Sequence, residues 1–278
     1  MLHTGGPTAN PAPVLSPQST ALTIAGSDPS GGAGLQADLK TFQQLGVYGM
    51  SVVTLLTVQN TRAVSRVELL SPEMILAQLD AVLDDIPPSV IKTGALGNAA
   101  AVQAVARRLS QVKCPIVVDP VLVSKHGHAL ASDDVVMAYQ HHLLPRALLI
   151  TPNRFETQRL TGIELKDHEA AQAAAGRLLE LGAQNVLIKL GERDDQSVHV
   201  LGSPEGTCQF LTPRLPADNT HGTGCILAAA IAAKLALGEK DIRQAVAFGI
   251  QRVLETISSN TRLGQGIHPA ETRAMRPA

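Results

Sequence analysis

The sequence has few aromatic residues and almost no net charge. Its 278 residues include two Tyr, four Phe and no Trp, and the formal net charge is -1. Proteins that bind nucleic acids use basic side chains to neutralise phosphates and aromatic side chains to stack on bases. Both resources are scarce here, so we expect a small-molecule partner and no nucleic acid.

Cysteine is scarce as well, and long apolar segments are missing. Three cysteines, an odd number, do not form a disulfide framework and suit a reducing compartment. No segment reaches the roughly 18 uninterrupted apolar residues of a membrane span. Residues 1–19 contain no Lys or Arg and no apolar run of signal-peptide length. We therefore expect a cytoplasmic protein without a membrane partner, in which residues 1–19 form a disordered tail.

What the chain does contain is a regular alternation of strand and helix patterns. Continuous apolar runs such as 21–26 and 50–58 predict strands that are covered on both faces. Helical patterns lie between them, including one that predicts a continuous helix over 132–143 with Ser132 as its cap. Such alternation over residues 20–278 predicts one doubly wound α/β domain, with ligands at the carboxyl ends of the strands.

The stretch from Leu215 to Gly238 joins a polar glycine turn directly to a long apolar helix. From Cys225 to Leu237 every residue except Lys234 is apolar, which predicts a buried helix. Gly222 and Gly224 let the backbone come close to a ligand. The unpaired N–H groups at the start of the helix favour an anion such as phosphate.

The cysteine at this junction has two interpretations. Helix N-termini lower thiol pKa values, so Cys225 is expected to be ionisable and reactive. The alternative is an ordinary glycine turn, with Thr220 or Thr223 as a helix cap and Cys225 as a small buried hydrophobe. The segment by itself leaves both open.

A second glycine loop contains a pattern typical of dinucleotide-binding proteins. Gly32-Ala33-Gly34-Leu35-Gln36-Ala37 fits G-x-G-x-x-A between a strand and a helix. That site also needs an acidic residue about 20 positions later to hold the ribose. The next strand ends in Gln59-Asn60, and no acid occurs before Glu68. NAD binding is therefore disfavoured. A P-loop motif is absent, and the histidines lack the spacing of a zinc site.

Polar residues recur just after the predicted strands. They are Asp28, Gln59, Lys92-Thr93, Asp119, Asn153 with Glu156, and Lys189. Each of them alone is also explained as a turn cap or a surface charge. Together at one edge of a parallel sheet they would form a pocket that suits phosphates and Mg²⁺. Asp38 lies four residues after Gly34, on the same helical face as the end of the glycine loop.

Several motifs together resemble one known family. LTIAGSDPSGGAGLQADLKTF, TVQNT, DPVLVSKHG, TPN with a following Glu, LIKLG and NTHGTGC are similar to the hydroxymethylpyrimidine/phosphomethylpyrimidine kinases of thiamine biosynthesis, in the ribokinase superfamily. The resemblance covers about Ala21 to Ile267. It implies a ribokinase-like three-layer α/β/α fold with a central, mostly parallel sheet, and a homodimer. It also implies that ATP with Mg²⁺ phosphorylates 4-amino-5-hydroxymethyl-2-methylpyrimidine and then its monophosphate.

The resemblance also assigns a substrate pocket. Gln59 would hydrogen-bond the edge of the pyrimidine, because an amide offers both a donor and an acceptor. The rest of the pocket would be formed by Asp38, Thr57, Gly26 and Ala33.

The remaining assignments concern the phosphoryl group. The anion hole around it would be formed by Gly222, Thr223 and Gly224. Cys225 takes the position of the aspartate base of sugar kinases, and Lys189 would reach the ATP phosphates. Asn153 and Glu156 look like the pair that organises Mg²⁺ and its waters, with Asp119 nearby. Backbone donors, lysine and Mg²⁺ suit a reaction that needs in-line positioning and charge neutralisation.

The sequence departs from the family pattern at three places. Ala95 stands where the family usually has Met, which implies a roomier pocket. His126 and His128 replace smaller or acidic residues, and Gly191-Glu192 lacks a second glycine, so the loop contacts to nucleotide are expected to differ.

Two rival functions remain open at this point. One is a pyridoxal kinase, or an enzyme that accepts both rings, which Ala95 favours. The other is a non-catalytic pyrimidine-binding protein on the same fold. Retention of the phosphoryl-transfer residues opposes the second, because a binding protein needs none of them. They are Lys189, Asn153, Glu156 and Cys225.

Overall fold

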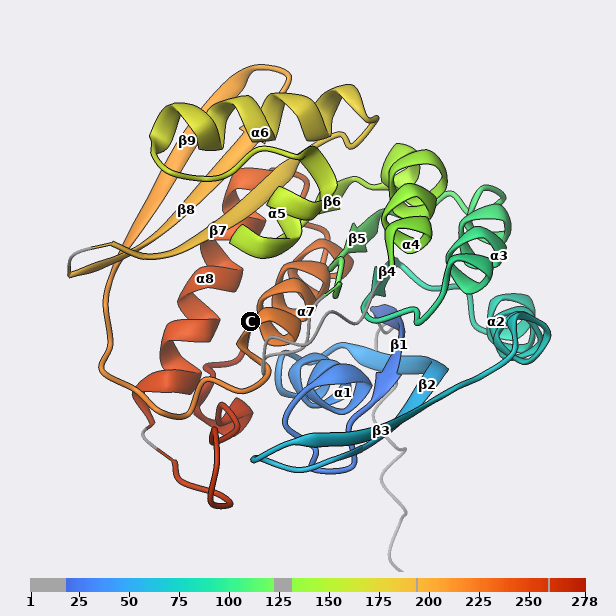
Figure 1. The fold of residues 1–278 in the computed structure, drawn as a ribbon. Helices are drawn as coiled ribbons and strands as arrows, with labels where there is room; N and C mark the ends of the chain where they lie inside the picture. The colour runs from blue at the N-terminus through green and yellow to red at the C-terminus, as the bar shows by residue number, and fades with distance from the viewer. Residues whose placement is uncertain (1–18, 123–131, 194, 260) are drawn as a thin grey trace, which may run out of the picture.

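A nine-stranded sheet forms the centre of the computed structural model, which describes residues 19–122, 132–193, 195–259 and 261–278 (Figure 1). The strands are β1 (Thr20–Ser27), β2 (Tyr48–Gln59), β3 (Val64–Leu69), β4 (Val90–Thr93), β5 (Ile116–Val118), β6 (Leu149–Ile150), β7 (Val186–Arg193), β8 (Gln196–Ser203) and β9 (Gly206–Pro213). Their order is β3-β2-β1-β4-β5-β6-β7-β8-β9. The six neighbouring strands β2, β1, β4, β5, β6 and β7 are parallel to one another. Strands β3, β8 and β9 each pair antiparallel with their neighbours. The expected mostly parallel sheet is confirmed.

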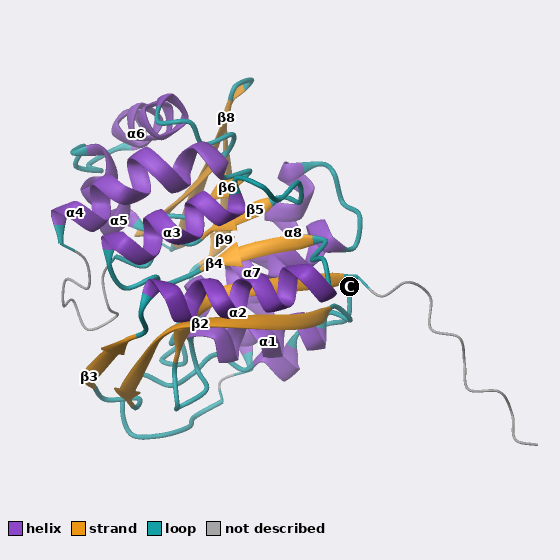
Figure 2. Ribbon diagram, turned by 90° about the vertical axis from the view of Figure 1, so that its right-hand side faces the viewer, coloured by secondary structure: helices purple, strands orange, loops and turns teal. Residues whose placement is uncertain are grey.

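Helices cover both faces of the sheet and give the expected three layers (Figures 1 and 2). One layer contains α2 (Pro72–Asp85), α3 (Ala99–Leu109), α4 (Asp133–Ala138), α5 (Arg154–Thr161) and α6 (His168–Glu180). The other contains α1 (Gly34–Gln44), α7 (Thr223–Ala236) and α8 (Ile242–Ser258). None of the helices in the described ranges is both long and apolar enough to cross a bilayer.

The apolar patterns explain where the core lies. All four residues of β4 and the six central residues of β1 are buried, as expected for strands covered on both faces. In α7, every side chain from Ile226 to Ala233 is buried. Its small Ala residues let α7 pack closely between the sheet and its neighbours α1 and α8. The prediction of a buried helix here is confirmed.

The predicted helix over 132–143 is present, but its second half is not α-helical. After α4 the chain forms a π-helical turn at Tyr139–Leu143 and then a short 3₁₀ turn at Leu144–Arg146. Ser132 precedes α4, but its hydroxyl bonds the Asp134 carboxylate instead of capping the helix. The Leu144 N–H donates to the carbonyl of Tyr139, five residues back, which is the hydrogen-bond spacing of a π-helix. The side chains of Tyr139 and Leu144 are both buried. The buried Tyr139 hydroxyl then donates to the Gly94 carbonyl at 3.2 Å.

The hairpin of β2 and β3 forms a flap at one edge of the sheet, and its tip is held by a distant part of the chain. The backbone N–H groups of Gln265 and Gly266 donate to the Thr61 hydroxyl at 3.2 and 3.1 Å. Five of the six β3 residues are exposed, which confirms the expected exposed strand or flap. The expectations for residues 1–18 and for His126 and His128 lie outside the described residues, whereas Ser19 accepts a hydrogen bond from the Tyr48 N–H.

Candidate active site

The carboxyl ends of β1, β2, β4 and β5 open into a cavity of about 1510 Å³. Every residue that the family resemblance assigns to the site lines this cavity except Asp38. They are Gly26, Ala33, Thr57, Gln59, Asp119, Asn153, Glu156, Lys189, Gly222, Thr223, Gly224 and Cys225. The sheet topology therefore brings together side chains that are far apart in the sequence.

The flap forms one wall of the cavity. Gln59 and Thr57 of β2 line it together with the apolar side chains of Val67 and Leu69 of β3. The Thr57 hydroxyl donates to the Ser27 carbonyl at 2.8 Å, so it is already engaged by the protein. An apolar wall that carries one amide suits a flat heteroaromatic ring with polar edge groups.

The anion loop lies at the start of α7. Gly222 precedes the helix with φ +84, and a side chain on it would overlap the carbonyl oxygen of Gly32, so glycine is required. The N-cap position is taken by Gly222 and not by either threonine of the alternative interpretation, and the Thr223 hydroxyl donates to the Thr220 carbonyl. The uncapped first turn faces the cavity and is suited to an anion.

The expected low pKa of Cys225 is not found. Burial raises the pKa of this thiol to about 12, although the positive charge of Lys92 opposes the shift. The Gly34 N–H also hydrogen-bonds the sulfur, with a small effect in the same direction as Lys92. Desolvation outweighs these favourable interactions, so the thiol is neutral in this structure.

Asp38 does not line the cavity, which corrects its expected place in the pocket. Its carboxylate is fully buried and accepts hydrogen bonds from Lys92 at 2.8 Å and from Thr23 at 2.6 Å. Lys92 does line the cavity. Burial alone would lower the pKa of Lys92, but the charge and hydrogen bond of Asp38 together with the charges of Cys225 and Asp119 outweigh burial and raise it, so the ammonium stays protonated. Asp38 therefore supports the site by holding Lys92.

Lys92 was recognised in the sequence only as one of several strand-end residues. The available signal was a lysine inside a strand whose other residues, Val90, Ile91 and Thr93, are suited to burial. A lysine in such a strand needs a buried acid as a partner. The identity of that acid could not be read locally, because Asp38 is 54 residues away.

Lys189 and two carboxylates form the opposite side of the cavity. The Lys189 ammonium lies 3.3 Å from the Asp119 carboxylate. Glu156 and Asn153 form a capping box at the start of α5, in which each side chain accepts from the other backbone N–H, at 2.8 and 2.9 Å. Burial raises the pKa of Glu156 to about 7; the charge of Lys189 opposes the shift and that of Asp119 adds to it.

These residues fit a magnesium ion that is shared with phosphates. Within the described ranges, no group of three or more His, Cys, Asp or Glu side chains could hold a metal alone. Mg²⁺ usually takes one or two protein carboxylates and completes its shell with substrate phosphates and water. Glu156 and Asp119, both buried beside the cavity, could supply those carboxylates.

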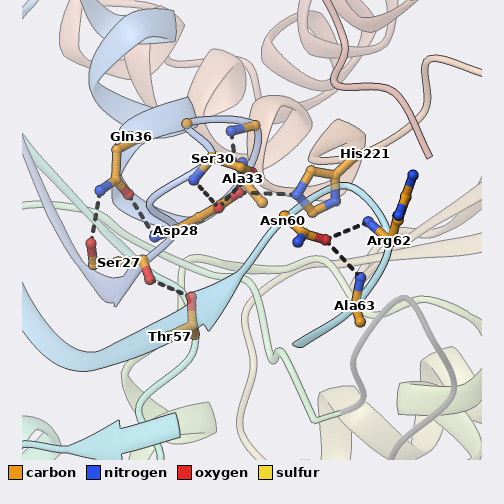
Figure 3. A network of polar contacts seen from close by, with 12 residues as sticks. Ser27, Asp28, Ser30, Ala33, Gln36, Thr57, Asn60, Arg62, Ala63 and His221 are labelled. Atoms are coloured by element: carbon orange, nitrogen blue, oxygen red, sulfur yellow. Dashed lines mark hydrogen bonds and ion pairs between the residues drawn. The ribbon is translucent and has the colours of Figure 1, made fainter. Parts of the chain in front are cut away.

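Asp28, expected from the sequence only as one of several strand-end residues, is paired with His221, which was not singled out from the sequence. The His221 Nε2 lies 3.0 Å from the Asp28 carboxylate, at 9% and 1% exposure respectively (Figure 3). Burial would raise the pKa of Asp28, but hydrogen bonds from His221, Ser30 and Gln59 hold it well below its usual range. The histidine is visible in NTHGTGC, but its partner is 193 residues away.

The sheet and the cavity define an α/β phosphotransferase, in which an acceptor wall, an anion loop and a lysine–carboxylate group share one cavity. Comparison with known proteins agrees with this class. The family model described as phosphomethylpyrimidine kinase matches residues 28–271. The chain belongs to this family.

Curated relatives with related names match most of the chain. The hydroxymethylpyrimidine/phosphomethylpyrimidine kinase of Bacillus subtilis is 40% identical over 259 residues, which cover 92% of this chain and 95% of the relative. The protein of the same name from Escherichia coli is 46% identical over 216 residues, with 77% and 81% covered. The thiamine biosynthesis bifunctional protein ThiED of Geobacter sulfurreducens is 45% identical over 255 residues, or 91% of this chain, which spans only 52% of that relative's length.

Solved structures show the same fold in two kinds of kinase. The pyridoxal kinase from Staphylococcus aureus in complex with ADP has a TM-score of 0.87 and 34% identity, with 93% of this chain and 95% of that chain covered. The phosphomethylpyrimidine kinase from Clostridium difficile has a TM-score of 0.77 and 37% identity, with 86% and 100% covered. Backbone similarity alone does not separate the two activities.

Proposed function

We propose that this protein uses ATP and Mg²⁺ to phosphorylate 4-amino-5-hydroxymethyl-2-methylpyrimidine and then its monophosphate, as a step of thiamine biosynthesis. The observation that carries the proposal is the shared cavity, in which the Gln59 wall faces the anion loop and the Lys189–Asp119 pair. Relatives named hydroxymethylpyrimidine/phosphomethylpyrimidine kinase support the choice of substrate.

In this proposal the two sides of the cavity have different tasks. Gln59 binds the edge of the pyrimidine, while Thr57, Gly26 and Ala33 shape the wall around the ring. Asp38 takes no part in that wall and acts only through Lys92.

On the other side, Lys189 binds the ATP phosphates and the start of α7, from Gly222 to Gly224, holds the transferred phosphoryl group. When bound, Mg²⁺ would neutralise charge on the phosphates, with Glu156, Asn153 and Asp119 nearest to it. Cys225 takes the position of the aspartate base of sugar kinases. Because its thiol is neutral in the free protein, it must first lose its own proton to solvent, which the charge of Lys92 favours, before it can accept the proton of the acceptor hydroxyl.

The test is a side-by-side turnover assay with ATP-Mg²⁺ and each of three acceptors: the hydroxymethylpyrimidine, its monophosphate and pyridoxal. We expect turnover of both pyrimidines. No turnover of either pyrimidine would refute the proposal. Tight binding of the pyrimidine without any turnover would instead favour a non-catalytic binding protein.

A second candidate is a pyridoxal kinase, or an enzyme that accepts both rings. It is favoured by the fold similarity to the Staphylococcus aureus pyridoxal kinase and by Ala95, a small residue on the cavity surface. A kcat/KM for pyridoxal above that for the pyrimidine would select it.

We also propose that the protein is a homodimer, on the basis of the family resemblance. Light scattering coupled to size-exclusion chromatography checks this, and a mass near 29.2 kDa, that of one chain, would refute it.

A further inference from the structure

Two loops from opposite ends of the sequence meet beneath the cavity. The first, residues 26–34, follows β1 and carries Gly26 and Ala33 of the acceptor wall. The second, residues 219–224, leads into α7 and forms the anion loop. Phosphoryl transfer from one loop to an acceptor on the other demands that their spacing be fixed, because reacting atoms must approach in line.

Asp28 is the centre of the contact between these loops. One carboxylate oxygen accepts from the backbone N–H and the hydroxyl of Ser30, at 2.8 and 2.7 Å. The other accepts from the N–H groups of Gly32 and Ala33, at 3.1 and 2.8 Å, and faces His221 Nε2 at 3.0 Å (Figure 3). An ionised carboxylate only accepts, so Nε2 of His221 must be the donor.

The loops also pack too closely to slide past each other. A Cβ atom on Gly32 would lie 2.6 Å from Cδ2 of His221, and one on Gly222 would overlap the Gly32 carbonyl. The backbone of His221 is held from its other side, because its N–H donates to the His268 carbonyl at 2.9 Å. The imidazole is therefore fixed between two segments and is not a freely rotating surface group.

The acceptor wall is attached to the same carboxylate. The Asp28 carboxylate holds Ala33 of that wall through its N–H at 2.8 Å, and the Gln59 side chain lies near enough to help lower the pKa of the same carboxyl. The Asp28 N–H donates to the Gln36 side chain at 2.8 Å, and Gln36 in turn donates to the Ser27 hydroxyl at 2.8 Å. Movement at Asp28 would thus displace both sides of the reaction.

We propose that Asp28 and His221 are positioning residues, whose hydrogen bond keeps the acceptor wall in register with the anion loop during phosphoryl transfer. The inference rests on the proposed kinase function and extends it to two cavity residues that the family resemblance did not assign. Neither side chain touches the transferred group; they act through Ala33, Gln59 and the anion loop. Loss of the bond should leave both substrates bound but misaligned, and should therefore lower kcat more than it raises KM.

Two variants of His221 isolate the bond. The amide nitrogen of Gln extends as far as Nε2 of histidine, whereas that of Asn reaches only the position of Nδ1, so His221→Gln keeps the donor and His221→Asn loses it. With ATP and the hydroxymethylpyrimidine, we expect His221→Asn to lower kcat roughly 10- to 100-fold, with each KM changed by less than about threefold. His221→Gln should stay within about fivefold of wild type.

A control variant perturbs the same loop but leaves the hydrogen bond between Asp28 and His221 intact. The exposed Lys40 side chain donates to the Gly31 carbonyl at 2.7 Å, and Lys40→Met removes that contact without touching Asp28. It should have wild-type kcat. The amount of ADP formed per phosphorylated product supplies a second readout, which should exceed one in His221→Asn because water competes with a misplaced acceptor. Rates are referred to the folded fraction measured by circular dichroism, so partial unfolding does not count as lost positioning.

Three outcomes would overturn the inference. The first is a kcat of His221→Asn within about threefold of wild type. The second is an equal loss in His221→Gln and His221→Asn, which would show that the donor at Nε2 is irrelevant. The third is a raised KM with unchanged kcat, which would mean a binding role. If wild type itself turns over neither pyrimidine, the proposed function fails instead, and this is seen before any variant is compared.

Discussion

The Lys92 ammonium lies 2.8 Å from the Asp38 carboxylate, and neither side chain is exposed to solvent. A buried ion pair is favourable only as long as both charges are present, because each one alone would be stranded in a medium of low polarity. The pair also places one positive charge just beneath the cavity wall, near Cys225. Lys92 thus links the stability of the core to the chemistry of the site.

Replacing Lys92 with Met should therefore destabilise the protein strongly. We expect a loss of about 3–5 kcal/mol in the free energy of unfolding, measured by urea titration, since Asp38 would lose its partner. Adding Asp38→Asn to Lys92→Met should recover most of this loss. The exposed pair Arg66–Glu68 is the control, and Arg66→Ala should cause no measurable change. If Lys92→Met alone were as stable as the wild type, Lys92 would not compensate a buried charge on Asp38.

The Cys225 thiol should behave as a weak acid. Because burial raises its pKa to about 12, the thiolate fraction rises about tenfold per pH unit across the neutral and mildly alkaline range. In a Cys114→Ser/Cys208→Ser background, the rate of alkylation by iodoacetamide should increase from pH 7 to pH 9.5 without a plateau. A plateau below about pH 8 would mean that the helix terminus overcomes burial after all.

Removal of the same thiol tests its part in the reaction. We expect Cys225→Ala to lower kcat far more than it changes the KM for the pyrimidine, because a proton acceptor acts mainly in the transition state. Steady-state kinetics with varied pyrimidine at saturating ATP-Mg²⁺ measure both constants. Near-normal kcat would remove Cys225 from the reaction.

Gln59→Leu should weaken binding of the pyrimidine. The leucine fills similar space but leaves polar groups on the ring edge without partners, at a cost of about 1–3 kcal/mol, or roughly 5- to 150-fold in Kd. Isothermal titration with the pyrimidine measures the change, and the affinity for an ATP analogue serves as the internal control. An unchanged Kd for the pyrimidine would assign Gln59 a structural role.

Glu156→Gln separates the metal-binding charge from the helix cap. Gln can still accept the hydrogen bond from the Asn153 N–H, so α5 keeps its capping box. We expect the Mg²⁺ concentration needed for half-maximal activity to rise at least about tenfold, because a carboxylate ligand is lost.

The stability of the wild type relative to the same variant should depend on pH in a defined direction. Burial raises the pKa of Glu156 to about 7, above the value of about 4.3 for an exposed Glu. The folded state therefore binds the proton more tightly, and the stability that this contributes is complete below about pH 4 and is lost as pH rises through 7. Relative to Glu156→Gln, the wild-type melting temperature should fall between pH 5 and pH 8. A constant difference between the two would contradict the raised pKa.

The sequence predicts the layers of this fold well because the signals are local. Apolar runs in β1 and β4 and the alanine-rich α7 need no knowledge of distant residues. The π-helical turn at Tyr139–Leu143 was missed for the opposite reason. Its geometry follows from a buried tyrosine that reaches the Gly94 carbonyl, 45 residues earlier in the chain.

The site shows the same division. Residues at strand ends could be placed at one edge, since parallel topology alone brings them together. The direction of a side chain could not be predicted in the same way. Helical spacing put Asp38 near the glycine loop, yet Lys92 and Thr23 on neighbouring strands turn it into the core. The thiol pKa was misjudged because burial of Cys225 depends on tertiary packing that its own helix does not reveal.

The hydrogen bonds at Thr61 also bear on the order in which the protein folds during synthesis. The flap is translated early, but its tip is secured by N–H groups 204 and 205 residues later. Contacts of such sequence separation form late, since a long loop must close first. On the ribosome, the wall that carries Gln59 therefore stays without its anchor until residue 266 has emerged, and a nascent chain with most of its sheet already built cannot yet hold its acceptor.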